Sequence, residues 1–244
     1  MNAHRTFATA GRVLNQLRHD PRTIALMLVV PCVLVGLLAW VFDGTSTFDA
    51  IGAPLLGIFP FVVMFLVTSI ATLCERTSGT LERLLTMPLG KLDLLVGYAL
   101  AFGAVAVVQA LLVSALSLTW FGLDVAGPTW LLLVVALADA LLGTALGLLV
   151  SAFASSEFQA VQFMPAFVLP QFLLCGLLVP RDRMPDVLHA VASVLPLSYA
   201  VDALRDVTTN AEVTTDAWVD LGVVVASVLL ALGLGAATLR RRTA

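Results

Sequence analysis

The sequence predicts an all-α membrane protein with six transmembrane helices, arranged as a single transmembrane domain over residues 1–244. The first observation is composition: 60% of the residues are hydrophobic and 12% are charged, whereas soluble domains carry about 25% charged residues. The second is that apolar runs of transmembrane length recur along the whole chain. The third is that basic residues and tryptophans gather at opposite ends of these runs. This composition excludes the soluble classes, and no nucleic-acid partner is expected.

The six runs are long enough to cross the hydrocarbon core, because about 20 helical residues cover roughly 30 Å. Backbone groups in lipid must find their hydrogen bonds within the segment, so the runs are predicted to be helices. The expected spans are residues 23–42, 53–74, 94–121, 129–150, 161–179 and 218–239.

The distribution of basic residues predicts the orientation. With the N-terminus in the cytoplasm, ten of the 13 basic residues fall on the cytoplasmic side, as the positive-inside rule requires. Six spans then return the C-terminus to the cytoplasm. The tryptophans agree, because they fall at the external ends of their spans, where indole rings favour the headgroup zone. These tryptophans are Trp40, Trp120, Trp130 and Trp218.

Residues 3–20 have the pattern of an amphipathic helix. Phe7, Ala10, Leu14 and Leu17 recur at steps of three and four residues, and arginines occupy the other faces. We expect this helix to lie on the inner membrane surface, with its arginines toward anionic lipid. Asp20 and Pro21 then predict an N-cap followed by proline at the first position of the first span.

The cytoplasmic loop over residues 75–90 carries a short apolar stripe of Leu81, Leu84 and Leu85, and Pro88 discourages continuation of the helix. Such a helix is suited to docking in a groove of a cytoplasmic partner. From the spacing alone, an interfacial loop helix without a partner is an equal alternative.

Residues 180–216 are expected to form external re-entrant helices, because their apolar patterns are too short and too polar to span the membrane. Pro180, Pro185 and Pro196 divide this region. Two interpretations remain open: a lid over the exit of a translocation path, or a cap that only stabilises the bundle.

Several features inside the spans matter for packing. Gly143 and Gly147 form a small-xxx-small pattern, which lets helix backbones approach closely. It predicts either a contact within the bundle or a contact between two copies. Prolines inside the spans predict either hinges or fixed kinks. They are Pro31, Pro54, Pro60, Pro165 and Pro170.

Four polar residues fall in or near the apolar runs: Asp139, Gln109, Gln162 and Gln171. An ionisable group at that depth faces the interior, pairs or protonates. Asp139 is therefore a candidate for lining a substrate path and meeting a cation, or else for a structural hydrogen bond. No catalytic or metal-ligand spacing is visible, so the chain is not predicted to be an enzyme.

The loop from Glu75 to Pro88 resembles the E-R-x-x-G-T-L-E-x-L-L-x-x-P signature of ABC-2 type exporter permeases. Residues 17–22, 156–160 and 176–205 also resemble that family in order and spacing, so the likeness covers nearly the whole chain. The bacterial drug and antibiotic resistance branch, such as the daunorubicin-type exporters, is the most similar.

The resemblance implies a function and a site. The chain would be the permease of a bacterial plasma-membrane exporter of drug-like compounds, lipids or natural products, paired with a second permease copy or a paralogue. Its coupling helix would enter a groove of the ATPase subunit, present in two copies. The coupling residues would be Glu75, Arg76, Gly79, Thr80, Leu81, Glu82, Arg83, Leu84 and Pro88.

The chain has no G-x-x-x-x-G-K-[ST] phosphate loop, because Gly90-Lys91 is followed by Leu92. No cofactor is therefore expected in this chain, and ATP and magnesium are expected on the separate ATPase. The alternatives are export of a lipid-linked polysaccharide, or a proton-driven secondary transporter with Asp139 as the proton site.

Overall fold

The computed structural model describes residues 3–43, 47–78 and 91–238. Within these ranges the chain is helical, with nine α-helices and one short 3-10 helix. The elements are α1 (Ala3–Arg18), α2 (Pro21–Val41), α3 (Thr47–Thr77), α5 (Lys91–Thr119), α6 (Thr129–Ser151), α7 (Glu157–Leu174), η1 (Arg181–Arg183), α8 (Asp186–Ala192), α9 (Pro196–Thr209) and α10 (Thr215–Thr238).

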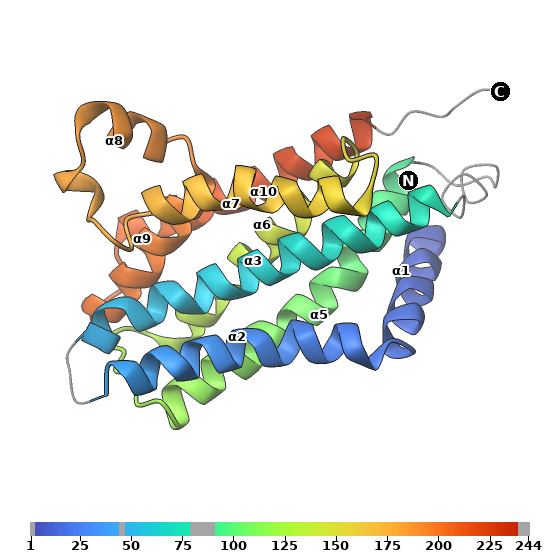
Figure 1. Ribbon diagram of the computed structural model, residues 1–244. Helices are drawn as coiled ribbons and strands as arrows, with labels where there is room; N and C mark the ends of the chain where they lie inside the picture. The colour runs from blue at the N-terminus through green and yellow to red at the C-terminus, as the bar shows by residue number, and fades with distance from the viewer. Residues whose placement is uncertain (1–2, 44–46, 79–90, 239–244) are drawn as a thin grey trace.

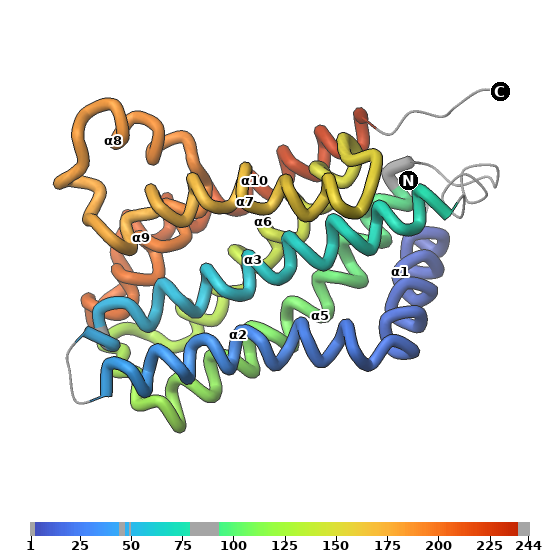
Figure 2. Tube along the Cα trace, in the orientation of Figure 1, coloured from blue at the N-terminus to red at the C-terminus, as the bar shows by residue number. Residues whose placement is uncertain are grey.

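The long helices run back and forth between two ends of one bundle (Figures 1 and 2). We name these ends by their flanking helices: the α1 end, where α1 lies and α10 ends, and the α9 end, where α8 and α9 lie. Among the described residues, five helices are long and apolar enough to cross a membrane, namely α2, α3, α5, α6 and α10. They match the predicted spans closely, and the chain is a multi-pass membrane protein.

Helix α7 stands in place of the fifth predicted span, 161–179, but begins and ends earlier, at Glu157 and Leu174. It runs between the two ends beside α3 (Figure 1). It is not among the five apolar helices, because Glu157, its glutamines and two prolines lower its hydropathy. Helices α8 and α9 pass the same test together but are bent by 89°, as a broken span or a re-entrant loop would be.

Helices α3 and α6 form a close seam through the centre of the bundle. A Cβ atom added to Gly143 would overlap the backbone oxygen of Phe61, and one added to Gly147 would lie 2.6 Å from the oxygen of Phe65. The backbones therefore touch where the side chains are missing. The small-xxx-small pattern is thus a contact within the chain.

At the α1 end, α1 packs across α5. Its buried face includes Ala10, Val13 and Leu17, whereas Phe7 and Leu14 are exposed. Part of the predicted apolar face of α1 therefore packs against the bundle, and the rest is exposed on the surface. Asp20 caps α2 as expected, because its Oδ1 accepts a hydrogen bond from the backbone N–H of Thr23 at 3.2 Å.

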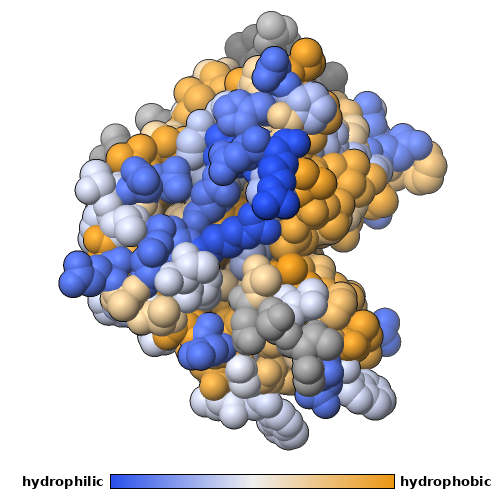
Figure 3. Space-filling model, turned by 90° about the vertical axis from the view of Figure 1, so that its left-hand side faces the viewer, coloured by the Kyte–Doolittle hydropathy of each residue, from blue (hydrophilic) through white to orange (hydrophobic). Residues whose placement is uncertain are grey.

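A polar network covers the α9 end, where hydrophilic residues cross the surface in a broad band (Figure 3). Arg181 pairs with Asp202 at 2.5 Å, and its guanidinium lies 5.0 Å from the ring centre of Tyr199. Gly176, at φ +93°, lies beside this pair, because a Cβ atom added to it would be 3.6 Å from Arg181 and 3.7 Å from Asp202. The four tryptophans lie at or next to this end of their helices, so the predicted grouping at one common end of the spans is confirmed.

Candidate functional site

The last turn of α3 contains the first residues of the predicted coupling segment, residues 75–90, and its residues contact other helices. Glu75 receives two hydrogen bonds from the guanidinium of Arg12 on α1, at 3.0 and 3.3 Å. The same guanidinium donates to the hydroxyl of Tyr98 on α5, at 2.9 Å. A bidentate arginine–carboxylate pair fixes direction as well as distance. Glu75 therefore joins α3 to α1 and α5.

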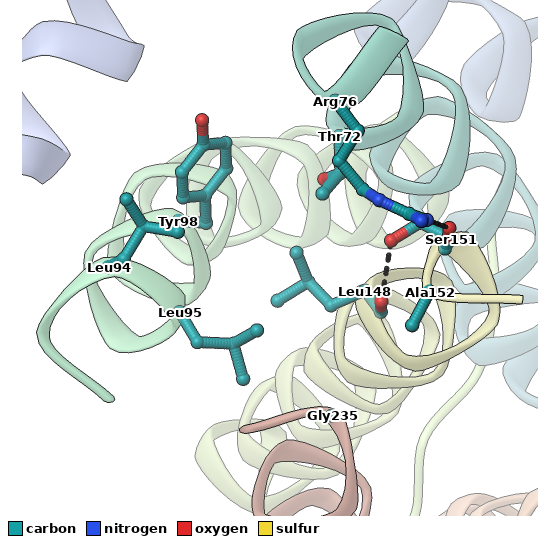
Figure 4. Close-up of a pocket in the computed structure, with 9 residues that line it drawn as sticks. All are labelled: Thr72, Arg76, Leu94, Leu95, Tyr98, Leu148, Ser151, Ala152 and Gly235. Carbon is teal, nitrogen blue, oxygen red and sulfur yellow. Dashed lines mark hydrogen bonds between the residues drawn. The ribbon is translucent and has the colours of Figure 1, made fainter. Parts of the chain in front are cut away.

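Arg76 points in another direction and caps α6. Its Nη1 donates to the backbone oxygen of Ser151, the last residue of α6 (Figure 4). The last carbonyls of a helix have no partner within it and carry partial negative charge, so a cation there is favourable. Arg76 also lines a small pocket of about 10 Å³ between α3, α5, α6 and α10, a volume near that of a single water site.

Cys74 completes the set, because its thiol donates to Glu157 Oε1 of α7 at 3.2 Å. Three consecutive residues at the end of α3 thus contact α7, α1 and α6 in turn. A displacement at this point would act on three helices together. These residues belong to α3 itself, whereas the sequence placed Glu75 and Arg76 in the loop.

The remaining predicted coupling residues lie outside the described residues. They are Gly79, Thr80, Leu81, Glu82, Arg83, Leu84 and Pro88.

The predicted path residue Gln109 supplies the hydrogen bond that a proline removes from another helix. Pro31 in α2 has no backbone N–H, so the oxygen of Met27, one turn earlier, loses its helical donor. Gln109 of α5 donates its Nε2 to this oxygen at 2.5 Å. All three residues are buried. The amide therefore satisfies the carbonyl that the proline frees.

Asp139 is fully buried on α6, in register with the seam glycines, and neither carboxylate oxygen has a hydrogen-bond partner among the described residues. Gln171 is buried on α7 and donates to the backbone oxygen of Phe167 at 3.2 Å. Gln162, on the same helix, is exposed. Within the described ranges, no hydrogen bond joins any two of the four predicted path residues.

Sequence reasoning did not identify Arg12, Tyr98 or Glu157 as parts of the site. Arg12 is 63 positions from Glu75 in the chain, and Glu157 is 83 positions from Cys74. The local sequence did not indicate the pair between Arg12 and Glu75, because a position of Arg12 facing lipid headgroups was equally consistent with its helical pattern. By contrast, the orphan carbonyl at Met27 follows from Pro31 directly, although its partner on α5 does not.

Comparison with known proteins agrees with this architecture. The family model for the ABC-2 type transporter matches residues 5–208. The probable multidrug ABC transporter permease YbhR of Escherichia coli (strain K12) is 28% identical over 153 residues, which are 63% of this chain and 42% of that protein. The linearmycin resistance permease protein LnrN of Bacillus subtilis (strain 168) is 26% identical over 182 residues, 74% of this chain and 47% of that protein.

A eukaryotic relative, ABC transporter G family member 20 of Dictyostelium discoideum, is 25% identical over 141 residues, 58% of this chain and 19% of that protein. The chain spans less than half the length of each of these curated relatives. The family model, however, covers most of this chain. It includes Cys74, Glu75 and Arg76, which we call the clamped end of α3, and the helices that they contact. The chain belongs to the ABC-2 type transporter family.

Proposed function

We propose that this chain is the membrane permease of a bacterial ABC exporter that moves an amphiphilic, drug-like compound outward. ATP and magnesium are bound by two copies of a separate ATPase subunit. The family and the functions named for the relatives, multidrug transport and linearmycin resistance, support this class of substrate.

The observation that carries the proposal is the clamped end of α3. Glu75 and Arg76 begin the predicted coupling segment, residues 75–90, and Cys74 directly precedes it. Because they contact α7, α1 and α6, a push on that segment by an ATPase moves the α1 end of the bundle as one unit. Rigid-body movement of this kind is a usual way of switching a bundle between two states.

The proposal places the α1 end in the cytoplasm and the α9 end outside the plasma membrane. The positive-inside rule supports this orientation, since most arginines of the described residues lie at the α1 end. The ATPase then meets the end of α3 from the side where ATP is present.

A second permease, either a copy of this chain or a paralogue, packs against α7. The outward face of α7 exposes Gln162 together with Leu169 and Leu173. An amide that faces lipid has no hydrogen-bond partner, which is unfavourable. A partner helix that covers this face removes the amide from lipid.

Transport in inverted membrane vesicles tests the function. The chain is co-expressed with a candidate ABC ATPase subunit, and accumulation of an amphiphilic fluorescent dye is followed. We expect accumulation to require ATP, to survive an ionophore that collapses the proton gradient, and to vanish when the phosphate-loop lysine of the ATPase is replaced. Accumulation that follows the proton gradient without ATP would identify a secondary transporter instead.

A charge exchange tests the clamp. Arg12→Glu and Glu75→Arg alone should each reduce transport severalfold without reducing membrane insertion, because each leaves two like charges together. The double exchange should recover most of the transport. Arg183→Glu, an exposed reversal at the α9 end, is the control and should leave transport unchanged. Equal loss in the single and double variants would show that the pair does not transmit movement.

A further inference from the structure

Asp139 lies in the middle of α6 with no exposed surface and with both carboxylate oxygens unpartnered among the described residues. It occupies the same face of α6 as Gly143 and Gly147, one turn and two turns further on, and this face lies against α3. A charged carboxylate without donors in an apolar interior is strongly unfavourable, whereas a neutral carboxylic acid is tolerated.

Two helices enclose the carboxyl group. From α3, Gly57 provides the space: a Cβ atom there would lie 2.7 Å from Asp139 Oδ2. The same added atom would lie 2.7 Å from Leu204 of α9, so Leu204 closes the space from the α9 side. Beyond the end of α7, Cys175 is close enough for its thiol to interact electrostatically with Asp139.

The charged groups near this position are engaged elsewhere. Arg205, which follows Leu204 in α9, donates to the backbone oxygen of Leu177 at 3.3 Å. Asp202 is held by Arg181. The thiol of Cys175 donates to the backbone oxygen of Phe172 at 3.1 Å. None of these groups supplies Asp139 with a donor or a compensating positive charge.

We propose that Asp139 is a proton-binding site: it holds a proton in the conformation shown and exchanges it only when α9 separates from α3. Gly57 makes room for the protonated carboxyl group, and Leu204 keeps water away from it. This assignment goes beyond the exporter function and does not depend on it.

The site has a defined effect on the conformational equilibrium. At neutral pH the conformation that buries Asp139 binds one more proton than a conformation that hydrates it. Raising the pH therefore favours separation of α9 from α3, and lowering the pH favours the conformation shown. In this proposal the proton leaves and returns through the α9–α3 contact alone, so it supplies no energy for transport and acts only as a regulator.

Infrared difference spectroscopy of the purified chain in lipid tests the site directly. The wild type minus Asp139→Asn difference should contain the C=O stretch of one protonated carboxyl group at neutral pH. Asp220→Asn, which removes the acidic group in the first turns of α10, is the control and should retain the band. Absence of the band in the wild type, or its loss in the Asp220 variant, would overturn the proposal.

Leu204→Ser tests the role of enclosure with the carboxyl group intact. The shorter, polar side chain admits water, so the band should disappear at a lower pH than in the wild type, and exchange in D2O should become faster. An unchanged titration midpoint in this variant, with the bundle folded by circular dichroism, would show that α9 does not control the proton.

Discussion

At the scale of single residues, the buried polar groups of this bundle fall into two kinds. Gln109 has a definite partner, the backbone oxygen that Pro31 leaves without a donor. Asp139 has none among the described residues. The first kind is a structural bond that fixes a broken helix to its neighbour, and it favours a fixed kink over a free hinge at Pro31. We therefore expect replacement of Gln109 to lower the stability of the bundle rather than to affect transport directly.

A double-mutant cycle checks this bond. Gln109→Leu should lower the free energy of unfolding by about 1–3 kcal/mol, because it leaves the oxygen of Met27 buried and unpaired. Pro31→Ala restores the backbone N–H that this oxygen lost. In the Pro31→Ala background the loss from Gln109→Leu should therefore be much smaller. The measurement is unfolding by SDS in mixed micelles.

Gln171→Leu is the matched control for this cycle, since it removes a glutamine whose amide bonds only its own helix, at Phe167. Its effect on the free energy of unfolding should be the same in the wild-type background and in the Pro31→Ala background. Strictly additive effects for Gln109 and Pro31 would show that the cross-helix bond contributes nothing.

At the scale of helices, the sequence predicted most of the elements, because hydropathy and the cap at Asp20 are local signals. It also predicted close packing at Gly143 and Gly147, and the structure supplies the partner, α3. It could not predict which residues pair at the α1 end, since a surface position for Arg12 was equally consistent with its pattern. Charge alone does not distinguish a lipid headgroup from Glu75.

Substitution of the seam glycines tests the role of the α3–α6 contact. Gly143→Ala places a Cβ atom on the backbone oxygen of Phe61, which cannot move aside without displacing α3. We expect the free energy of unfolding to fall by about 1–3 kcal/mol, as for other overpacked sites. A thermal-aggregation assay in detergent provides the measurement.

Gly233→Ala in α10 is the control for the seam, because nothing lies within 4 Å of its added Cβ atom. It should be neutral, or stabilising by a few tenths of a kcal/mol to about 1 kcal/mol from helix propensity. If Gly143→Ala were as well tolerated as Gly233→Ala, the close approach of α3 and α6 would not be needed for stability.

At the scale of the whole molecule, whether the two chain termini lie on the same side of the membrane depends on whether α7 crosses it. In the part of the chain that the structure describes, five helices are apolar enough to cross, and five crossings would place the two chain termini on opposite sides. The structure instead places the described ends of the chain together, because α7 also runs the length of the bundle. The glutamines and prolines of α7 lower its hydropathy. A partner helix that covers these polar residues would make α7 acceptable as a membrane span.

Cysteine labelling of the segments on either side of α7 decides whether it crosses. In a variant whose native cysteines are replaced by alanine, single cysteines are introduced at Ser155 and Asp182, both exposed and flanking α7. A membrane-impermeant maleimide applied to intact spheroplasts should label position 182 and should label position 155 only after the membrane is opened. Asn15 and Asn210, exposed at the α1 and α9 ends, give the reference patterns for the two sides. Labelling of 155 and 182 from the same side would mean that α7 does not cross, and the C-terminus would then lie opposite the N-terminus.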